Sequence, residues 1–144
     1  MYDKFGQFIN GKWMKSSSGE TYDVINPANE EIIGKASKAN KNDIELALKS
    51  AKNGFNIWKN TSPWERSKII RKISELIREK KDILAKWLTL EVGKPLKESN
   101  GEVLGGADIF EWSSEEAKRI YGETLQGRNI DTRIHVYYQP VGVV

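Results

Sequence analysis

The chain has 144 residues, the length of one typical domain, of which 38% are hydrophobic and 30% charged, as in ordinary globular proteins. Its 23 Lys and Arg residues are interleaved with 20 Asp and Glu residues, and the excess of +3 is spread along the chain, so we expect no nucleic-acid partner. Cysteine is absent and histidine occurs once, which excludes disulfides, thiolate metal sites, a cysteine nucleophile and a histidine-rich metal centre within this sequence.

The opening stretch, MYDKFGQFIN, has no apolar leader segment, and no later run approaches the ~20 apolar residues of a membrane span. We therefore expect a cytoplasmic protein without a membrane partner. Strand signals follow in QFINGKWM, where Asn10-Gly11 between apolar flanks predicts a hairpin, and then in TYDVINP and IIGKA. Phe8 to Ala36 is thus predicted to form one small antiparallel sheet.

Helical periodicity dominates the middle of the chain. One apolar stripe runs over Asp43 to Phe55, and a second helix begins behind Ser62, because SPWE has capping-box spacing with proline at the first helical position. A third helix starts near Asp82 and ends at Gly93, a natural C-terminal cap. The charged stretch RKISELIREKK is interpreted as the solvated face of the second helix.

A fourth helix is predicted from Pro95 to Tyr121, closed by Gly122, although three glycines lie inside it: Gly101, Gly105 and Gly106. Each should cost roughly 1 kcal/mol relative to alanine in a helix interior. Two explanations remain open: another backbone packs closely against the glycines, or the glycines leave room for a ligand.

The last part of the chain reads as strand. Ile130 to Tyr138 alternates apolar and polar residues, which predicts a long strand with no hairpin partner nearby, and such an exposed edge favours pairing with another chain or with further sequence. The apolar run QPVGVV is typical of the start of a strand buried on both faces.

No complete catalytic constellation is evident. There is no G-x-G-x-x-G or phosphate-loop motif, and Glu111, Glu115 and Glu116 are expected on the surface. His135 lies on the polar face of the last strand and is interpreted as structural. Glu91 precedes a Gly-Lys-Pro turn, where helix carbonyls lack partners, so it is either a cation ligand or a solvated or salt-bridged glutamate.

Six stretches carry a family resemblance, in this order: FINGKW, DVINPANEEIIGKA, SPWERSKIIRKISELI, LTLEVGKPLKES, GEVLGGADIFEWSSEEAKRIYGETL and YYQPVGVV. Together they resemble the N-terminal part of an NAD(P)-dependent aldehyde dehydrogenase, most closely the succinate-semialdehyde branch, with an archaeal-type glyceraldehyde dehydrogenase as the alternative. The fold implied is α/β: an incomplete Rossmann-like domain with a small β-sheet, four helices and an oligomerisation strand.

The resemblance also implies a division of the chain. Residues 1–124 would be the N-terminal part of the cofactor-binding domain, residues 125–139 an arm strand that pairs subunits in a dimer or tetramer, and residues 140–144 the start of the first Rossmann-like strand. The implied reaction oxidises an aldehyde, a semialdehyde above all, to a carboxylic acid with NAD or NADP through a cysteine thiohemiacetal. Catalytic and cofactor-binding residues would lie beyond Val144, so the chain alone is expected to be inactive.

Two minor sites follow from the same resemblance. The backbone carbonyl of Ile25 and the carboxylate of Glu91 would hold a monovalent cation, and Gly106 and Phe110 would form a wall of the aldehyde entrance. A non-enzymatic alternative is a short assembly module that pairs through its free strand.

Overall fold

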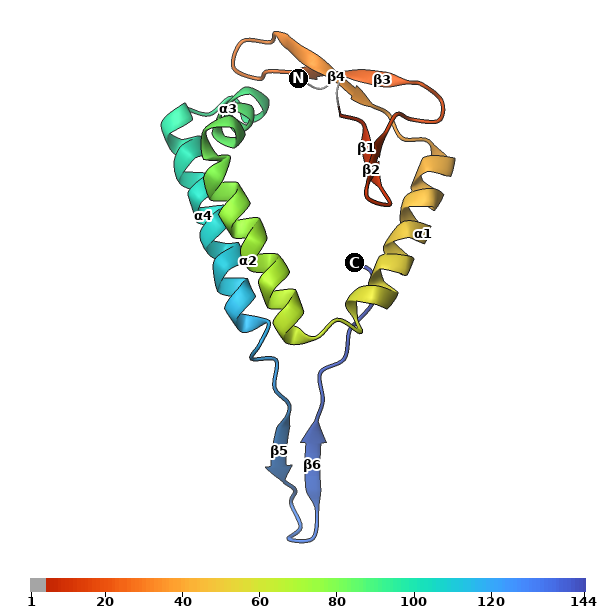
Figure 1. Cartoon of the computed structure of the whole chain (residues 1–144), viewed down its shortest axis with the longest axis vertical. Helices are drawn as coiled ribbons and strands as arrows, with labels where there is room; N and C mark the ends of the chain where they lie inside the picture. Colours follow the sequence, from red (N-terminus) through yellow and green to blue (C-terminus); the bar gives the residue numbers. More distant parts are fainter. Residues whose placement is uncertain (1–4) are drawn as a thin grey trace.

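The computed structural model describes residues 5–144, which form the incomplete α/β arrangement expected of the N-terminal part of an aldehyde dehydrogenase (Figure 1). Its elements are β1 (Gln7–Ile9), β2 (Lys12–Met14), β3 (Thr21–Ile25), β4 (Ile32–Ser37), α1 (Lys41–Trp58), α2 (Pro63–Glu79), α3 (Lys81–Val92), α4 (Leu96–Glu116), β5 (Glu123–Gln126) and β6 (Arg133–Val136).

The strands of residues 5–144 form three separate antiparallel hairpins, β1–β2, β3–β4 and β5–β6. The hairpin predicted at Asn10-Gly11 is confirmed, with both turn residues at positive φ, 53° and 75°. The prediction of one sheet over Phe8 to Ala36 is wrong, because β1–β2 and β3–β4 share no strand pairing. Each hairpin pairs only within itself, so the edges of its two strands lie open.

The predicted starts of α1 and α2 depend on capping side chains. Asn40 and Asp43 form a reciprocal capping box at α1, which begins two residues before the predicted position. The hydroxyl of Ser62 accepts the backbone N–H of Glu65 at 3.2 Å, and Pro63 is the first residue of α2. Side chains thus satisfy backbone donors that the first turn of each helix leaves unpaired.

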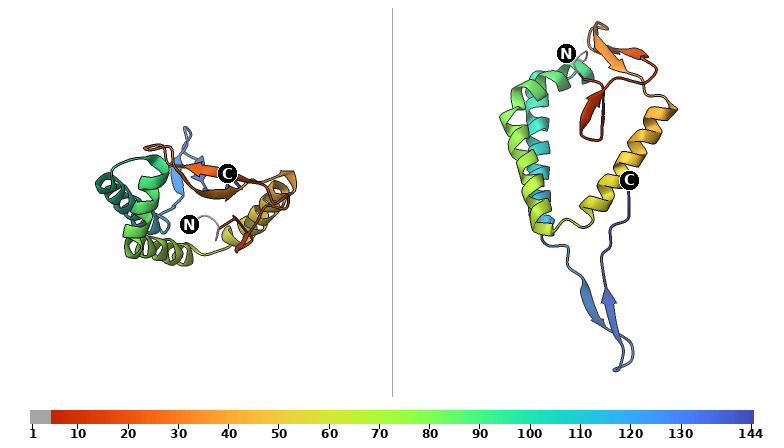
Figure 2. Two further views of the ribbon diagram at one scale, coloured as in Figure 1. Left: turned by 90° about the horizontal axis from the view of Figure 1, so that it is seen from above. Right: turned by 45° about the vertical axis from the view of Figure 1, so that its right-hand side comes forward.

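Helices α2 and α4 share the most extensive contact between any two helices of residues 5–144, and they pack along their lengths through small side chains (Figure 2). Ala107, Ser99 and Ser114 of α4 are fully buried, and Ser74 of α2 donates its hydroxyl to the carbonyl of Ala107 at 2.8 Å. Small residues let the helix axes approach closely, and the hydroxyl satisfies a second lone pair of a buried carbonyl.

Residues 123–136 form a protruding hairpin rather than a single strand, and the chain then runs back toward α1 (Figure 1). The predicted extension of α4 to Tyr121 and its closure by Gly122 are wrong: the helix ends at Glu116, and Lys118 and Arg119 donate to carbonyls only three residues back. The prediction that the last strand lacks a hairpin partner is also wrong, because β5 pairs with β6. Residues 137–144 belong to no strand here, so the strand start at 140–144 stays a prediction.

Large apolar side chains remain mostly exposed. Among residues 5–144 the buried hydrophobic residues are Ile9, Ala85, Ala107 and Ala117, and three of these are alanines. Helix α1 diverges from the α2–α4 pair after a short connection (Figures 1 and 2), and few of its residues contact either of those helices. Within residues 5–144, α1 therefore shares no hydrophobic core with α2 and α4.

Candidate functional site

The predicted cation ligands lie on two elements joined by a close contact. Ile25 ends β3, and Glu91 lies in the last turn of α3, where its side chain is exposed. Gly93 caps α3 at a φ of 75°, and a Cβ there would lie 3.0 Å from Cγ of Pro27 and 3.2 Å from the nitrogen of Ala28. The turn after Ile25 is thus seated on the end of the helix that carries Glu91.

Asn26 shapes that turn. It is 9% exposed, its N–H donates to the carbonyl of Glu31 at 2.9 Å, and its side-chain Oδ1 accepts the N–H of Ala28 at 2.9 Å. Such a local side-chain bond holds the chain in a tight turn. Among residues 5–144 no three Asp, Glu or His side chains gather as a metal would require. A cation at this place would therefore depend on backbone carbonyls.

Two of the predicted site residues, Glu91 and Gly106, line one cavity of about 470 Å³ between α3 and α4. The rest of its lining is mainly apolar: Ile77, Leu84, Trp87, Leu88, Glu102 and Val103. Lys94 forms an ion pair with Glu102 at its edge. Ile25 and Phe110 are not part of this lining. The cavity therefore brings together one residue of the predicted cation pair, Glu91, and one residue of the predicted entrance wall, Gly106.

The glycines of α4 face open space. A Cβ added at Gly101, Gly105 or Gly106 would meet no atom within 4 Å outside its own helix neighbourhood. No backbone of residues 5–144 packs closely against these glycines, and whether they leave room for a ligand stays a prediction. Phe110, one turn after Gly106, is 39% exposed.

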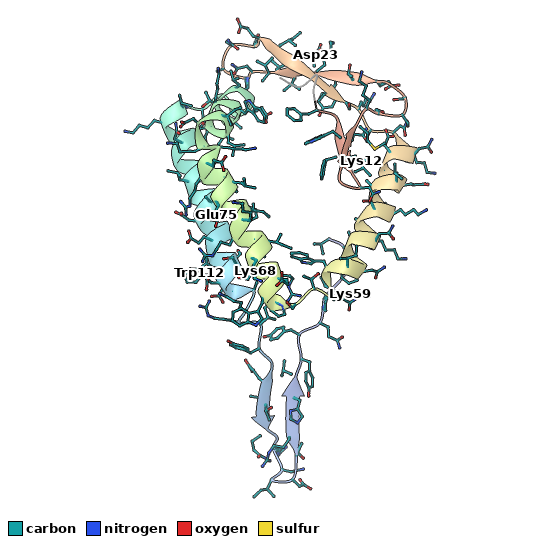
Figure 3. The ribbon with its side chains drawn as sticks, viewed as in Figure 1. Lys12, Asp23, Lys59, Lys68, Glu75 and Trp112 are labelled. Atoms are coloured by element: carbon teal, nitrogen blue, oxygen red, sulfur yellow. The ribbon has the colours of Figure 1, made fainter. Side chains whose placement is uncertain are left out.

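Sequence reasoning missed two more exposed apolar side chains on α4. Ile109 and Trp112 are 68% and 71% exposed, and helical spacing puts them on one face with Gly101 and Gly105. Figure 3 shows Trp112 on the outer side of α4, away from the space between α1 and α2. The spacing of Ile109 and Trp112, three residues apart in the predicted helix, was the sequence signal that could have placed both side chains on one face.

The charged face of α2 is not simply solvated, which corrects its interpretation. Arg71 contacts Glu111 at 3.2 Å and Glu115 at 2.7 Å, and Arg78 contacts Asp108 at 2.5 Å and Glu111 at 2.9 Å. The ion pair with Lys118, together with that with Arg71, lowers the pKa of Glu115 to about 2. These carboxylates join α4 to α2, and a pKa this low is poorly suited to proton transfer near neutral pH.

A buried carboxylate ties the N-terminal hairpin to α1. Asp43 is 4% exposed and accepts hydrogen bonds from the backbone of Asn40, from Gln7, from Ser17 and from the hydroxyl of Ser16. These donors, the Asn40 N–H foremost, hold the pKa of Asp43 far below its usual value. The network is an anchor for local structure, since every donor belongs to the loop or strand next to the helix start.

A dinucleotide site does not fit the described residues. Residues 5–144 contain antiparallel hairpins only, without the parallel strand pair and glycine-rich strand-to-helix turn on which a dinucleotide normally rests.

His135 lies on β6, where its ring nitrogen is 3.1 Å from the hydroxyl of Thr124. None of the helices formed by these residues combines the length and apolar character needed to cross a membrane.

Comparison with known proteins gives a consistent family. Residues 13–144 match the aldehyde dehydrogenase family model. The NADP(+)-dependent succinate-semialdehyde dehydrogenase of Escherichia coli is 41% identical over 135 residues, and the glutarate-semialdehyde dehydrogenase of Pseudomonas putida is 41% identical over 136, each alignment covering 94% of this chain and 28% of the relative.

Solved structures agree with these relatives. The crystal structure of an NADP-dependent enzyme from Escherichia coli superimposes with a TM-score of 0.83 at 38% identity, over 92% of this chain and 28% of that one. Betaine aldehyde dehydrogenase of Staphylococcus aureus, in complex with NAD+, gives 0.80 at 32% identity, over 89% and 26%. The chain thus spans little more than a quarter of the length of these proteins. It belongs to the aldehyde dehydrogenase family.

Proposed function

We propose that this chain is the N-terminal segment of an enzyme that oxidises a semialdehyde to the corresponding carboxylic acid with NAD or NADP. The observation that carries the proposal is the 41% identity, over 94% of the chain, to enzymes named for succinate semialdehyde and glutarate semialdehyde. Both substrates carry a carboxylate at the far end from the aldehyde. The substrate class proposed is therefore a short aliphatic aldehyde acid.

A second substrate candidate has support of its own. The 3-sulfolactaldehyde dehydrogenase of Pseudomonas putida is 37% identical over 136 residues. Its named substrate is again an aldehyde with an anionic group at the other end. The shared feature across these names is an anionic aldehyde, and a glyceraldehyde-type substrate without that charge is less well supported.

Within the enzyme, we assign the chain supporting roles. Gly106 and Phe110 would form part of the aldehyde entrance. The alternative wall of that entrance is the face of the same helix that carries the more exposed Ile109 and Trp112. The carbonyl of Ile25 and the carboxylate of Glu91 would hold a monovalent cation beside the turn at Pro27. The support for the cation site is the seating of that turn on Gly93.

The hairpin is the proposed contact between subunits of a dimer or tetramer. It protrudes from the helical part, and its apolar side chains are exposed: Leu125 46%, Ile130 91% and Ile134 47% (Figure 1). Each strand of a two-stranded hairpin leaves one edge unpaired, and such an edge favours strand pairing with another chain. Because β5 begins at Glu123, we extend the proposed arm of 125–139 to include Glu123 and Thr124.

The chain by itself is proposed to be inactive, because the sequence contains no cysteine to form a thiohemiacetal. The test mixes purified chain with succinate semialdehyde and either NAD or NADP and follows reduction of the nicotinamide. We expect no reduction above the enzyme-free rate. Sustained formation of NADH or NADPH, lost when the semialdehyde is omitted, would contradict this part of the proposal.

A further inference from the structure

The dipeptide Asn-Gly occurs three times in the chain, in three different surroundings. Asn10-Gly11 forms the turn between β1 and β2, Asn53-Gly54 lies inside α1, and Asn100-Gly101 lies inside α4. Asn-Gly is prone to lose the side-chain amide, because glycine has no side chain to shield its backbone nitrogen. Since the three copies share the reactive dipeptide, the structure around each one decides which of them reacts.

The reaction is an intramolecular cyclisation that needs only water. The backbone nitrogen of the glycine bonds to Cγ of the asparagine, the bond from Cγ to Nδ2 breaks, and ammonia leaves with the proton of the glycine amide. Water then opens the resulting succinimide at one of its two carbonyls. One opening gives aspartate, and the other gives isoaspartate, whose main chain runs through Cβ and Cγ and is longer by one methylene.

The copy in the hairpin turn has the fewest contacts that oppose this reaction. Asn10 and Gly11 are both exposed, and a Cβ added at Gly11 would meet no atom within 4 Å. The strand ladder pairs Ile9 with Lys12, so the N–H of Gly11 lies in the turn and takes no part in strand pairing. Cyclisation requires rotation of the backbone between the two turn residues, and here that rotation disrupts only the turn itself.

The other two copies are held by their helices. A helix keeps each interior N–H in a bond to the carbonyl four residues earlier, which applies to Gly54 in α1 and Gly101 in α4. The side chain of Asn100 is held as well, because its Nδ2 donates to the carbonyl of Leu96 at 2.9 Å and its Oδ1 is buried. Either glycine nitrogen can attack only after part of its helix has opened.

The surroundings of the turn accept a new carboxylate. The β1–β2 hairpin lies beside α1 (Figure 1), and Asn10 lines a cavity of about 150 Å³ together with Leu46, Lys49, Ser50 and Asn53 of that helix. The ammonium of Lys49 favours a negative charge in this cavity. An aspartate of ordinary backbone at position 10 is therefore compatible with the hairpin, and any damage must come from the added methylene of isoaspartate.

That methylene falls in a turn whose two strands lead to one carboxylate. Gln7 at the start of β1 donates to Oδ2 of Asp43 at 3.1 Å, and Ser16, two residues after β2, donates to the same oxygen at 2.9 Å. The register that aligns them depends on a turn of two ordinary residues. A longer turn shifts one strand against the other, so both donors cannot keep their positions at Asp43.

We propose that Asn10-Gly11 is a spontaneous modification site, that isoaspartate forms there before it forms at the other two copies, and that this isoaspartate releases the N-terminal hairpin from Asp43. The inference concerns residues 7–43 and does not depend on the proposed function.

The site is tested by ageing the purified 144-residue chain in mildly alkaline buffer at physiological temperature and digesting it with trypsin. The three copies fall in separate peptides, residues 5–12, 53–59 and 98–118. Mass spectrometry measures the loss of each amide, and electron-based fragmentation distinguishes isoaspartate from aspartate. We expect peptide 5–12 to convert at least about tenfold faster than the other two, because those wait for helix opening. Equal rates, or faster conversion of either helical copy, overturn the site.

Two controls separate structure from sequence. In denaturant the three peptides should convert at similar rates, and a preference for Asn10 that persists unchanged there would overturn the structural argument. Asn10→Gln should abolish conversion at position 10, since the longer side chain does not form a succinimide. Asn53→Gln is the matched control and should leave conversion of peptide 5–12 unchanged.

Thermal unfolding tests the release of the hairpin. The isoaspartate form, separated from the aged chain, should melt at a lower temperature than Asn10→Asp, which carries the same charge without the extra methylene. In an Asp43→Asn background the difference should shrink at least about twofold, because the anchor has already been weakened. Equal melting temperatures for the isoaspartate form and Asn10→Asp, or an undiminished difference in the Asp43→Asn background, overturn the release.

Discussion

The carboxylate of Asp43 accepts the hydroxyl of Ser16 at 2.9 Å, across 27 residues of sequence, and this bond joins the N-terminal hairpin to the start of α1. The same carboxylate caps its own helix through the N–H of Asn40 at 3.1 Å. One side chain thus performs a local task and a long-range one, and it does so from a position that is 4% exposed.

Replacing Asp43 with asparagine should lower the melting temperature of the chain at neutral pH. A neutral amide is a weaker acceptor than a carboxylate, and only its oxygen can accept a hydrogen bond because its nitrogen is a donor. The hydrogen bonds depress the native pKa of Asp43 below its ordinary value of 3.8. The stabilisation is therefore fully present above that value and is lost progressively as the pH falls from it through the lower native pKa.

The measurement is thermal unfolding of wild type and Asp43→Asn across the acid range. The difference in melting temperature should be largest near neutral pH, should shrink progressively below pH 3.8 as the unfolded state takes up the proton of Asp43, and should vanish only below the depressed native pKa. A difference that stays constant down to the most acid pH would show that charge on Asp43 plays no part. Asp23→Asn is the matched control, since Asp23 is an exposed partner of Lys35.

Ser74→Ala should destabilise the α2–α4 pair. The substitution removes the 2.8 Å bond to the buried carbonyl of Ala107, and a bond of this kind contributes about 0.5–1.5 kcal/mol to the free energy of unfolding. Denaturant unfolding of the chain measures it. Ser113→Ala, on the exposed side of α4, is the control and should change little; an equal effect of both variants would contradict the assignment.

Gly93→Ala should disturb the link between α3 and the turn after Ile25. The left-handed φ of 75° costs a non-glycine residue roughly 1–2 kcal/mol, and the added Cβ would lie 3.0 Å from Pro27. Both effects lower stability. Gly101→Ala is a sharp control, because its Cβ meets nothing and alanine favours helix, so it should raise stability by up to roughly 1 kcal/mol. Equal destabilisation by both would contradict this reading of the glycines.

Substitutions on α4 should distinguish the two candidate faces of the aldehyde entrance. In a chimeric enzyme carrying this segment, Trp112→Ala should change KM for the semialdehyde severalfold if the Ile109–Trp112 face is the wall, and Phe110→Ala should do so if the Gly106–Phe110 face is. Trp64→Ala, on α2, is the matched control for loss of an exposed tryptophan. KM unchanged in both α4 variants would exclude this helix from the entrance.

Local signals predicted the elements that depend on local chemistry. The Asn10-Gly11 turn, the Ser62 cap with Pro63, and the Gly93 cap each appear where the sequence indicated them. These features succeed because a few neighbouring residues decide the backbone conformation, whether by positive φ, by a side-chain acceptor or by a missing donor.

Tertiary features were harder to predict. The strand Glu123–Gln126 is polar at most positions and lacks apolar alternation, and its connection to β6 is longer than a two-residue turn, so its pairing left no periodic signal. The ion pairs of Arg71 and Arg78 with α4 required knowing which face of α2 meets α4. Of the predicted site residues, the sequence could not show that Glu91 and Gly106 share a cavity.

The most direct test of the account replaces the matching segment of the Escherichia coli succinate-semialdehyde dehydrogenase with residues 13–144 of this chain and measures NADP reduction with succinate semialdehyde. The account predicts a folded, oligomeric chimera that oxidises the semialdehyde at a rate within about tenfold of the parent, because the exchanged segment is proposed to support the site and to hold none of the reacting groups. A chimera that folds and assembles like the parent but shows no semialdehyde oxidation would contradict it.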